Sequence, residues 1–510
     1  MYPLFCYLYQ TRSSNHYPNM KNKLLLLFMV SGLFASAQNG ITWSAPMDVA
    51  SSTYSNGHPR IVLDRSGNPL VLWGNAASQK AVFSRWNGSS FTTPVTLNPV
   101  SIPVFAASWA GPDIASKGDT VYIVYKHTPE DTNHIYLVHS FNGGVTFSSP
   151  ARVDFIADSI SRFPTLTTNT SGNPIVAFMK FSSGFTNSRW AVTRSADYGI
   201  TFSTDIKTSG YSGANAICDC CPGGIVSSAN NVAILYRDNL SNLRNMWTGI
   251  STNGGITFPA GFDIDKTNWN ISACPASGPD GIMIGDSLYS VFMSGASGKS
   301  LVYFSKSSIS NLVSGPSLPF TGNFSGLSVQ NYPRIANSGN AVAGVWEQTV
   351  NSVGQADIFF TKNISNGFPA TYDTVALSAS NSIANTDVAL SQETVQVVWE
   401  DDNSGTVKYR KGTFTPLNTG ISNPAASFSG LQLYPNPGNG IFTVETNFES
   451  GKKIYLSVQN IVGEELHHTY YNNPSSGKYE LDINDLPNGI YILKLTSGAE
   501  ITMRKIIIAK

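Results

Sequence analysis

A short motif that returns seven times along the chain constrains the fold more than any other feature of the sequence. Each copy opens with a proline or its equivalent, continues through a small loop and ends in an apolar, aromatic strand. A period a little above 50 residues with four strand-like stretches per unit predicts four-stranded sheets that stack on their neighbours around a ring, as in a β-propeller. We call this opening residue the marker of its unit. The seven markers are Pro59, Pro112, Pro164, Pro222, Pro279, Pro333 and Thr386. Their separations are 53, 52, 58, 57, 54 and 53 residues.

The composition agrees with an all-β chain. Gly, Asn, Ser, Thr and aromatic residues are abundant, and long helical runs rich in Ala, Glu, Lys and Leu are missing. Charge is sparse and balanced, with 32 basic and 32 acidic residues, so we expect neither nucleic acid nor an acidic membrane surface as a partner. A chain of 510 residues is long enough for two or more domains.

The N-terminal segment carries an export signal that begins at Met20. Two lysines precede the apolar run 24–30, and a small-residue cleavage site follows it. We therefore expect residues 1–19 to be an over-extended start and residues 20–37 to be a signal peptide. The apolar run is too short to span a bilayer and no later segment is long enough, so the sequence predicts no transmembrane segment.

Three units share a sharper motif in their second half, Ser-x-Asp/Asn-x-Gly-x-Thr-Phe. The Asp or Asn side chain can bond the turn backbone, the glycine permits positive φ and the aromatic residue anchors the turn, so the motif predicts a tight hairpin. It resembles the Asp-box (BNR repeat) of sialidase-like propellers, in which these turns have a structural role. The residues concerned are Ser140, Asn142, Gly144, Thr146, Phe147, Ser195, Asp197, Gly199, Thr201, Phe202, Ser251, Asn253, Gly255, Thr257 and Phe258.

The start of the mature chain looks like a displaced outer strand. Residues 40–46 match the strand that follows an Asp-box, and the seventh unit ends soon after Thr406. Residues 41–48 can fill the vacant position in that unit and so remove an exposed sheet edge. We therefore expect residues 38–416 to form a seven-bladed, sialidase-like propeller. A six-bladed ring is the alternative, because six blades are the rule among true sialidases.

A separate module follows the linker 417–430, which is rich in Asn, Ser, Gly and Ala. Its Leu-Tyr-Pro-Asn-Pro opening from Leu433, a Leu-Pro-Asn-Gly turn and a basic final strand resemble the type A C-terminal sorting domain of type IX secretion. Alternating strands such as 479–483 and 491–495 predict a small Ig-like β-sandwich over residues 431–510. The resemblance implies that the type IX secretion machinery is a partner and that the protein reaches the outer cell surface or the medium by way of the periplasm.

Four cysteines remain after signal cleavage, and all of them lie in the fourth and fifth units, near the start of the innermost strand. They are Cys218, Cys220, Cys221 and Cys274. An exported chain meets oxidising conditions, so we expect disulfides between the first three and Cys274, and four thiols allow three pairings. A thiolate site for a soft metal ion, a strained bond between Cys220 and Cys221, and free thiols are the alternatives.

The residue after the marker is charged in five of the seven units. Equivalent positions on innermost strands converge at one mouth of the central channel, where charged groups are unexpected if they only support packing. Two arginines could hold a ligand carboxylate, and the aspartates could accept sugar hydroxyls or coordinate calcium. A self-neutralising ring of ion pairs is the alternative. Together with the arginine two residues before the third marker, the candidate ligand-binding residues are Arg60, Asp113, Arg162, Asp280, Arg334 and Asp387.

These features leave three functions open. The first is a secreted or surface-attached propeller that binds glycan or another extracellular ligand at the channel mouth. The second is a sialidase-type exo-glycoside hydrolase, a family that uses an arginine triad, a tyrosine nucleophile with a glutamate, and an aspartic acid. Tyr332, Glu347 and Glu400 lie at plausible strand ends, but the sequence assigns no catalytic residue and no metal site, and calcium is the one cofactor left open. The third is an adhesive or structural surface protein.

Overall fold

The computed structural model divides the chain into two compact units, with the boundary between Thr415 and Pro416. The expected over-extended start, the signal peptide and all but the first residue of the linker lie outside the described residues. The described residues are 40–50, 55–99, 101–155, 159–417, 431–445, 453–460, 463–471, 478–497 and 500–510.

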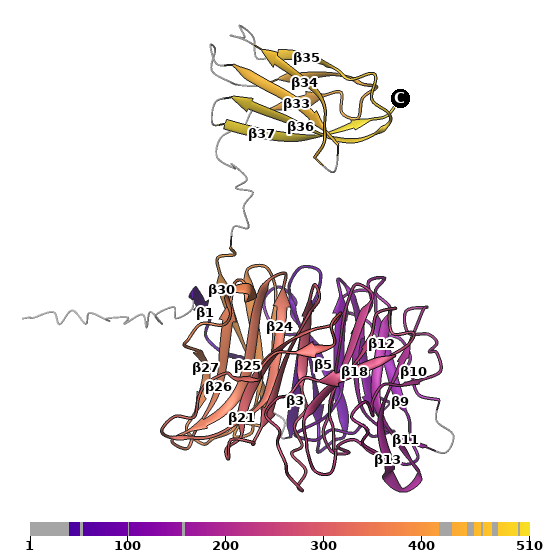
Figure 1. Ribbon diagram of the computed structural model, residues 1–510, viewed down its shortest axis with the longest axis vertical. Coiled ribbons are helices and arrows are strands. Elements are labelled where there is room, and N and C mark those ends of the chain that lie inside the picture. The colour runs from indigo at the N-terminus through magenta and orange to yellow at the C-terminus, as the bar shows by residue number, and fades with distance from the viewer. Residues whose placement is uncertain are drawn as a thin grey trace, which may run out of the picture. The chain divides into compact units, whose positions relative to one another are not determined.

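The described residues of the first unit form seven antiparallel sheets, numbered here sheet 1 to sheet 7 in chain order (Figure 1). Sheet 1 consists of β3 (Asn56–Leu63), β4 (Pro69–Asn75), β5 (Lys80–Arg85) and β6 (Val95–Thr96). Sheet 2 consists of β7 (Asp113–Lys117), β8 (Thr120–Lys126), β9 (Ile135–Ser140) and β10 (Ala151–Arg152). Sheet 3 consists of β11 (Ser159–Thr168), β12 (Pro174–Ser182), β13 (Thr186–Arg194) and β14 (Ile206–Lys207). Sheet 4 consists of β15 (Gly224–Ser228), β16 (Asn231–Arg237), β17 (Met246–Ser251) and β18 (Ala260–Asp263).

The other three sheets follow the same plan. Sheet 5 consists of β19 (Asp280–Ile284), β20 (Ser287–Ser294), β21 (Leu301–Ser308), β22 (Val313–Ser314) and β23 (Leu318–Pro319). Sheet 6 consists of β24 (Leu327–Ser338), β25 (Ala341–Val350), β26 (Val353–Thr361) and β27 (Asp373–Ser378). Sheet 7 consists of β28 (Ile383–Leu390), β29 (Thr394–Asp401), β30 (Thr406–Phe414), β1 (Ile41–Trp43) and β2 (Met47–Asp48). Two short 3-10 helices, Ser183–Phe185 and Ile364–Asn366, lie between strands.

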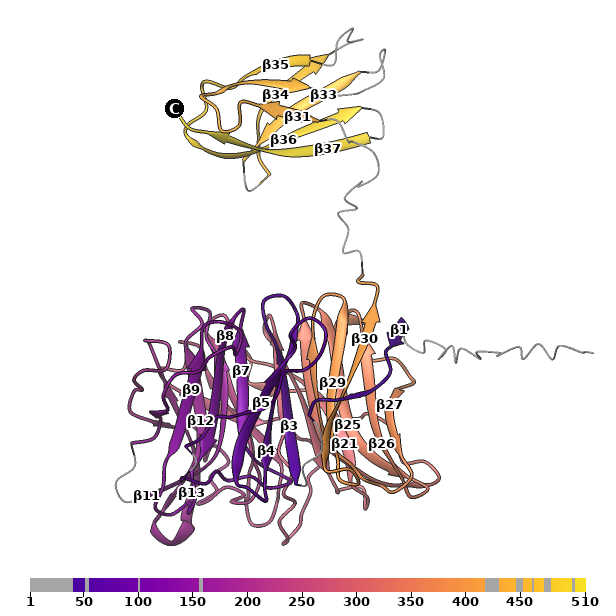
Figure 2. The same cartoon turned by 180° about the vertical axis from the view of Figure 1, so that it is seen from behind.

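Sheet 7 is completed by the start of the described chain, as the sequence predicts. β1 and β2 both pair antiparallel with β30, so that Ile41 lies opposite Phe414 and Met47 opposite Tyr409. Figure 2 shows β1 beside β30. The added strands cover the outer edge of β30, which would otherwise offer unpaired backbone groups to another chain.

The seven sheets close into a ring. The first strand of each sheet contacts the first strand of the next, from β3 through β7, β11, β15, β19, β24 and β28 and back to β3. Buried apolar side chains fill the space between each pair of neighbouring sheets, including the closing pair, where Val398 of β29 meets Val71 and Trp73 of β4. Each sheet therefore buries both of its faces against neighbours, and the first unit has an all-β, propeller-like fold.

Four of the seven first strands carry a β-bulge directly before the marker. The pairing register shifts there in sheets 1, 3, 6 and 7. The residue before each of these markers has a positive φ, which is uncommon for a side chain other than glycine. These residues are His58, Phe163, Tyr332 and Asn385. Bulges of this kind re-aim side chains, and here they sit at one end of the innermost strands.

The second unit has two sheets around one core. The first contains β31 (Gln432–Tyr434), β32 (Ile441–Glu445) and β35 (Lys478–Asp482). The second contains β33 (Ile454–Gln459), β34 (Glu465–Tyr471), β36 (Gly489–Ser497) and β37 (Glu500–Ile508). Phe442 and Leu481 from the first sheet and Leu456 and Leu493 from the second belong to a single buried cluster, so the two sheets pack face to face.

Candidate functional site

The charged residues that follow the markers lie on the first strands, where the ring is narrowest. The side chains of Arg60, Asp113, Asp280 and Arg334 are at most 20% exposed, and Asp387 is 9% exposed. Arg60, Asp113 and Arg334 line one small cavity, Asp280 pairs with Arg334, and Asp387 interacts with Arg60. Five of the six residues that the sequence proposes for the channel mouth therefore lie close together.

The three aspartates join neighbouring sheets. Each carboxylate accepts a hydrogen bond from the backbone N–H two residues after the marker of the adjoining sheet, which secures one first strand to the next. The donor and acceptor pairs are Ile61 to Asp387 at 2.9 Å, Leu166 to Asp113 at 3.2 Å and Ile335 to Asp280 at 3.0 Å. The aspartates thus have a structural task that sequence inspection alone did not reveal.

The two arginines at the mouth differ in their partners. Arg60 donates from Nη1 to the Pro59 carbonyl at 3.0 Å, its Nη2 lies 2.6 Å from His58 Nε2, and its Nε lies 3.7 Å from Asp113 Oδ1. The Arg334 side chain has only a loose ion pair with Asp280, at 3.9 Å, and no hydrogen bond to another described residue. Its five N–H donors are therefore available to a ligand.

Two narrow cavities adjoin these arginines, with volumes of about 10 and 20 Å³. Arg60 and Arg334 line both of them, together with Pro222 and Gly223. A space of this size holds about one water molecule. A sugar ring cannot enter, but one carboxylate or hydroxyl group of a ligand could reach the arginines while the rest lies over the mouth.

A second set of charged residues lies at the mouth, and the sequence singles out two of them, Glu347 and Glu400, without assigning them a role. Each residue of the set follows a buried aromatic residue of a second strand and reaches the next sheet. Glu400 accepts from the backbone N–H of His58 at 2.9 Å, and Glu347 accepts from that of Asn385 at 2.8 Å. The recurring Val-Trp-Glu at residues 345–347 and 398–400 is the signal that could have identified them.

The same position is basic in two other sheets. Lys126 donates to Ser161 Oγ in sheet 3 at 3.0 Å, and Arg237 donates to the Met293 carbonyl in sheet 5 at 2.8 Å. Both side chains are almost fully buried, and burial lowers the pKa of Lys126 to about 8. These four residues therefore connect neighbouring sheets by side-chain hydrogen bonds.

Burial shifts the acids at the mouth toward their neutral form. It raises the pKa of Asp280 to about 7, that of Glu347 to about 7 and that of Glu400 to about 8. It also raises the pKa values of Asp113 and Asp387, against the opposing effect of Arg60. Near neutral pH the mouth therefore carries less negative charge than its five carboxyl groups suggest.

Arg162 lies apart from the other two arginines. Its Nε donates to Glu130 Oε1 at 2.9 Å, and its guanidinium stacks on Phe163 at 4.6 Å from the ring centre. It lines neither cavity at the mouth. The reason is the bulge, because Arg162 and Thr165 pair on opposite sides of it. Arg162 therefore does not lie with the other candidate residues around these cavities.

The three Asp-box-like turns share one hydrogen-bond pattern. In the turn at Ser195, the Ser195 hydroxyl accepts from the Gly199 N–H at 2.8 Å, and Asp197 Oδ1 accepts from the Thr201 N–H at 2.9 Å. The corresponding distances are 2.9 and 3.0 Å in the turns at Ser140 and Ser251. Within these turns Gly144, Gly199 and Gly255 have φ values of 78°, 86° and 82°. The aromatic residues that end the motifs, Phe147, Phe202 and Phe258, pack on apolar clusters.

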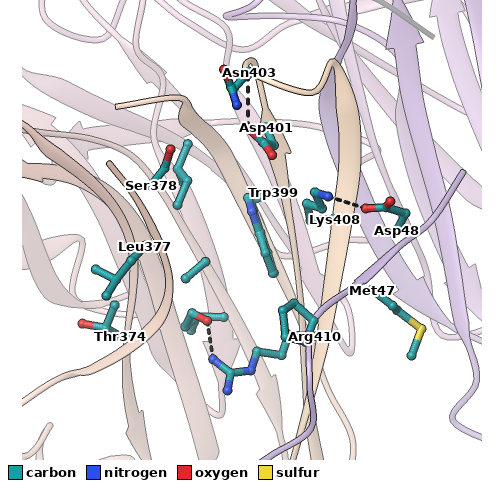
Figure 3. A pocket seen from close by; sticks show the side chains of 14 residues that line it. Met47, Asp48, Thr374, Leu377, Ser378, Trp399, Asp401, Asn403, Lys408 and Arg410 are labelled. Atoms are coloured by element: carbon teal, nitrogen blue, oxygen red, sulfur yellow. Dashed lines mark hydrogen bonds and ion pairs between the residues drawn. The ribbon is translucent and has the colours of Figure 1, made fainter. Parts of the chain in front are cut away.

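A roomier groove of about 440 Å³ lies between sheets 6 and 7 (Figure 3). Its charged side chains are already engaged. Lys408 Nζ pairs with Asp48 Oδ1 at 2.5 Å, and Arg410 donates to the Ser44 and Val375 carbonyls. These contacts hold β2 and β27 against β30, so we assign the groove to closure of the ring.

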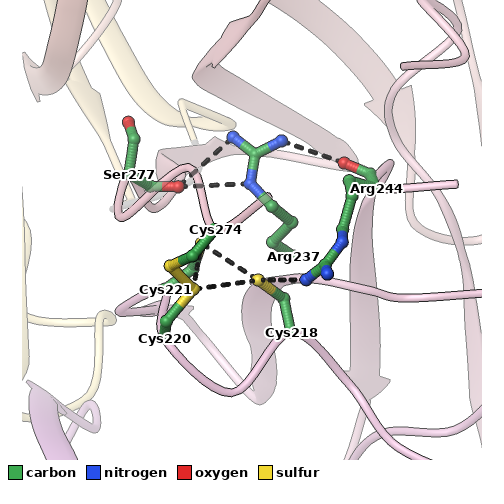
Figure 4. Close-up of a disulfide and its surroundings, with 7 residues drawn as sticks. All are labelled: Cys218, Cys220, Cys221, Arg237, Arg244, Cys274 and Ser277. Atoms are coloured by element: carbon green, nitrogen blue, oxygen red, sulfur yellow. Dashed lines mark hydrogen bonds between the residues drawn. A yellow bond between two sulfur atoms is a disulfide. The ribbon is translucent and has the colours of Figure 1, made fainter. Parts of the chain in front are cut away.

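The cysteine cluster links sheets 4 and 5 (Figure 4). Cys220 and Cys274 form a disulfide, and Cys218 and Cys221 are buried free thiols. Among the described residues, the one group of three or more side chains with metal-ligand spacing consists of Cys218, Cys220 and Cys221. In the described part of the chain, the mouth aspartates form no such group.

Comparison with known proteins identifies the second unit. Residues 432–509 match the family described as the secretion system C-terminal sorting domain. The protein therefore carries a type IX sorting domain and is exported to the cell surface or secreted. In the described part of the chain, no helix has the length and apolar character needed to span a bilayer.

No curated protein matches the chain. Among solved structures, a protein of unknown function from Dyadobacter fermentans is 9% identical over 74% of this chain and 100% of its own, with a TM-score of 0.45. An α-L-arabinanase from Penicillium chrysogenum, complexed with arabinobiose, is 11% identical over 60% of this chain and 94% of its own, with a TM-score of 0.40. An ulvan lyase is 8% identical over 72% of this chain and 95% of its own, with a TM-score of 0.44. Likeness at this level carries no argument about activity.

Proposed function

We propose that the exported protein is a binding propeller whose ligand is a glycan that bears a carboxylate. The ligand carboxylate would lie against Arg334, with Arg60 beside it, and the sugar rings would lie over the mouth. In this proposal the seven sheets are the blades of one sialidase-like propeller, and the three Ser-x-Asp/Asn turns are its Asp-boxes. Residues 20–37 are the signal peptide, and the second unit is an Ig-like, type A sorting domain.

The observation that carries the proposal is the state of the Arg334 side chain. It is 20% exposed, it borders both cavities, and it has no hydrogen bond to another described residue. A guanidinium donates two parallel hydrogen bonds to a carboxylate, and each bond to a charged group contributes about 1.5–3 kcal/mol. An exposed arginine would gain much less, because water already satisfies its donors.

The neighbouring acids favour the same assignment. At neutral pH and below, Glu347, Glu400 and Asp280 hold protons for much of the time, because burial raises their pKa values to between about 7 and 8. A ligand anion then meets the two arginines with little opposing negative charge. Affinity should fall as pH rises through this range, since each carboxyl that ionises repels the ligand.

The test is retention of the mature protein on an array of acidic and neutral glycans. We expect the wild type to retain acidic glycans, Arg334→Ala to lose them and Arg334→Lys to keep only part of the signal, because lysine cannot form the paired bonds. Lys408→Ala in the groove between sheets 6 and 7 is the matched control and should bind as the wild type does. Equal retention by Arg334→Ala, or loss only with Lys408→Ala, would place the ligand elsewhere.

A hydrolase is the second candidate, and one observation favours it. A carboxyl group with a pKa of about 8, such as that of Glu400, has the protonation state of a general acid near neutral pH. Tyr332 is a poor nucleophile in this setting, because burial and the nearby Glu347 raise its pKa to about 12. Release of free sugar from acidic glycosides by the wild type, absent in Glu400→Gln, would replace the binding assignment with a catalytic one.

A further inference from the structure

The four cysteines place two free thiols against a disulfide. The Sγ atoms of Cys218 and Cys221 are 3.2 Å apart, and both residues are only 1% exposed. The Sγ of Cys220, which is bonded to Cys274, lies 3.6 Å from that of Cys218 and 4.0 Å from that of Cys221 (Figure 4). Packing alone does not explain why three sulfur atoms are in contact here, because apolar side chains could fill the same space.

The environment of Cys218 favours a thiolate. Arg244 donates from Nη1 to Cys218 Sγ at 3.0 Å, and the fully buried Arg237 lies close by. The hydrogen bond between the Cys218 and Cys221 side chains, followed by the charges of Arg244 and Arg237, lowers the pKa of Cys218 to about 6 against the opposing effect of burial. The pKa of Cys221 is raised by burial and by its neighbour Cys218. One thiol of the pair is therefore the nucleophile and the other is the proton donor.

We propose that these residues form a thiol–disulfide exchange site in which Cys218 attacks the Cys220–Cys274 disulfide. The Cys218 sulfur forms a bond to the Cys220 sulfur while the Cys220–Cys274 bond breaks. The bonding electron pair leaves with the Cys274 sulfur, which takes up the proton that Cys218 gave up. The step is a rearrangement with no net oxidation or reduction, so it needs no outside oxidant.

Exchange would release a link between two segments that border the ring mouth. Cys220 and Cys274 join the segment before β15 to the segment before β19. Pro222 and Pro279, which follow these cysteines, line the same cavity as Arg334. The site would therefore control how firmly the two segments are held at the mouth, whatever ligand the mouth binds.

Trypsin gives a direct readout of the exchange. Cleavage after lysine and arginine leaves Cys274 alone on the peptide 267–299 and the other three cysteines together on 208–237. The mature protein is held at neutral pH, quenched with acid, alkylated in denaturant and digested. Before exchange the two peptides are linked and 208–237 carries two alkyl groups. After exchange the peptides separate, and each carries one.

The expected result is a measurable share of separated peptides from the wild type, each singly alkylated. Cys221→Ser should also give separated peptides, but there only 267–299 carries an alkyl group, because 208–237 has no thiol left. Cys218→Ser should give linked peptides only, and Arg244→Gln should slow their separation at least tenfold. Linked peptides alone from the wild type at every time point would overturn the proposal, as would separation that persists in Cys218→Ser. If the Cys218 variant does not fold, separation of the two peptides in Cys221→Ser decides the question, because Cys218 is then the one free thiol of the cluster.

Discussion

The Asp-box-like turns and the ring mouth both contain acidic side chains that accept hydrogen bonds, but the pKa values of these side chains shift in opposite directions. Asp197, in a turn, accepts hydrogen bonds from the Thr201 hydroxyl and backbone and from Ser195, and these bonds lower its pKa to about 2. Glu400, at the mouth, also accepts two hydrogen bonds, yet burial raises its pKa to about 8. Desolvation therefore outweighs hydrogen bonding at the mouth, whereas hydrogen bonding prevails where water remains close.

This difference separates repeated residues that stabilise a fold from repeated residues that are prepared for a ligand. In the turns, each polar group of the motif has a partner within the turn, and an added ligand would have to break those bonds. At the mouth, the acids join neighbouring sheets, but the Arg334 guanidinium has N–H donors that make no hydrogen bond to another described residue. The comparison predicts that substitutions in the two regions change different measurements.

The largest expected effect is on the pH dependence of stability. The folded-state pKa of Glu400 is about 8 against an ordinary value of 4.5, so its stabilising effect is full below 4.5 and is lost as the pH rises to about 8. Glu400→Gln should flatten this fall by up to about 1.4 kcal/mol per pH unit. Urea unfolding at several pH values measures the slope. If the free energy of unfolding has the same slope against pH in the wild type and the variant, burial does not raise the pKa of Glu400, and the difference between the mouth and the turns is contradicted.

A smaller effect is expected from Gly144→Ala in the first Asp-box-like turn. Gly144 has a φ of 78°, and an added Cβ would lie 2.5 Å from Cζ of the buried Phe83. The matched control is Gly143→Ala, which has a φ of 65° and meets only Asp119 Oδ1 at 4.0 Å. Both variants adopt the left-handed conformation, so the difference between them, about 1–3 kcal/mol in free energy of unfolding, isolates the clash. Equal losses would mean that Phe83 moves aside freely.

The smallest effect is expected from Asp197→Asn. The two sister turns already contain asparagine, and Asn142 and Asn253 accept the same backbone hydrogen bond at 3.0 Å. The free energy of unfolding at neutral pH should therefore change by no more than about 0.5 kcal/mol. The curve of stability against pH should run parallel to that of the wild type from about pH 5 to 9, since Asp197 is ionised throughout this range in both states. A changed slope would show that the turn is coupled to a titrating group.

The sheets could be predicted from the sequence because their signals are local. Each marker, loop and apolar strand lies within one unit, and the seven copies reinforce one another. The contacts across the mouth could not be predicted in the same way. That Asp387 accepts from Ile61 depends on ring closure between segments more than 300 residues apart, as the pair separation of 326 shows.

The site shows the same division. Arg60 and Arg334 are candidates because they follow the markers, and both line the cavities at the mouth. Arg162 lies apart from them, next to the bulge at Phe163, which cannot be read from residue spacing. The repeated Val-Trp-Glu marks Glu347 and Glu400 in the sequence. Their role becomes clear only from the structure, where each accepts a hydrogen bond from the next sheet. The cysteine pairing depends on distances between loops, and spacing along the chain leaves three choices open.

The most direct test of the account is the affinity of the mature protein for an acidic oligosaccharide selected on the glycan array, measured by calorimetry for three proteins. The wild type and Asp197→Asn should bind alike, and Arg334→Ala should bind at least tenfold more weakly, a loss of about 1.4 kcal/mol or more. If Arg334→Ala binds as tightly as the wild type, the ring mouth is not the ligand site.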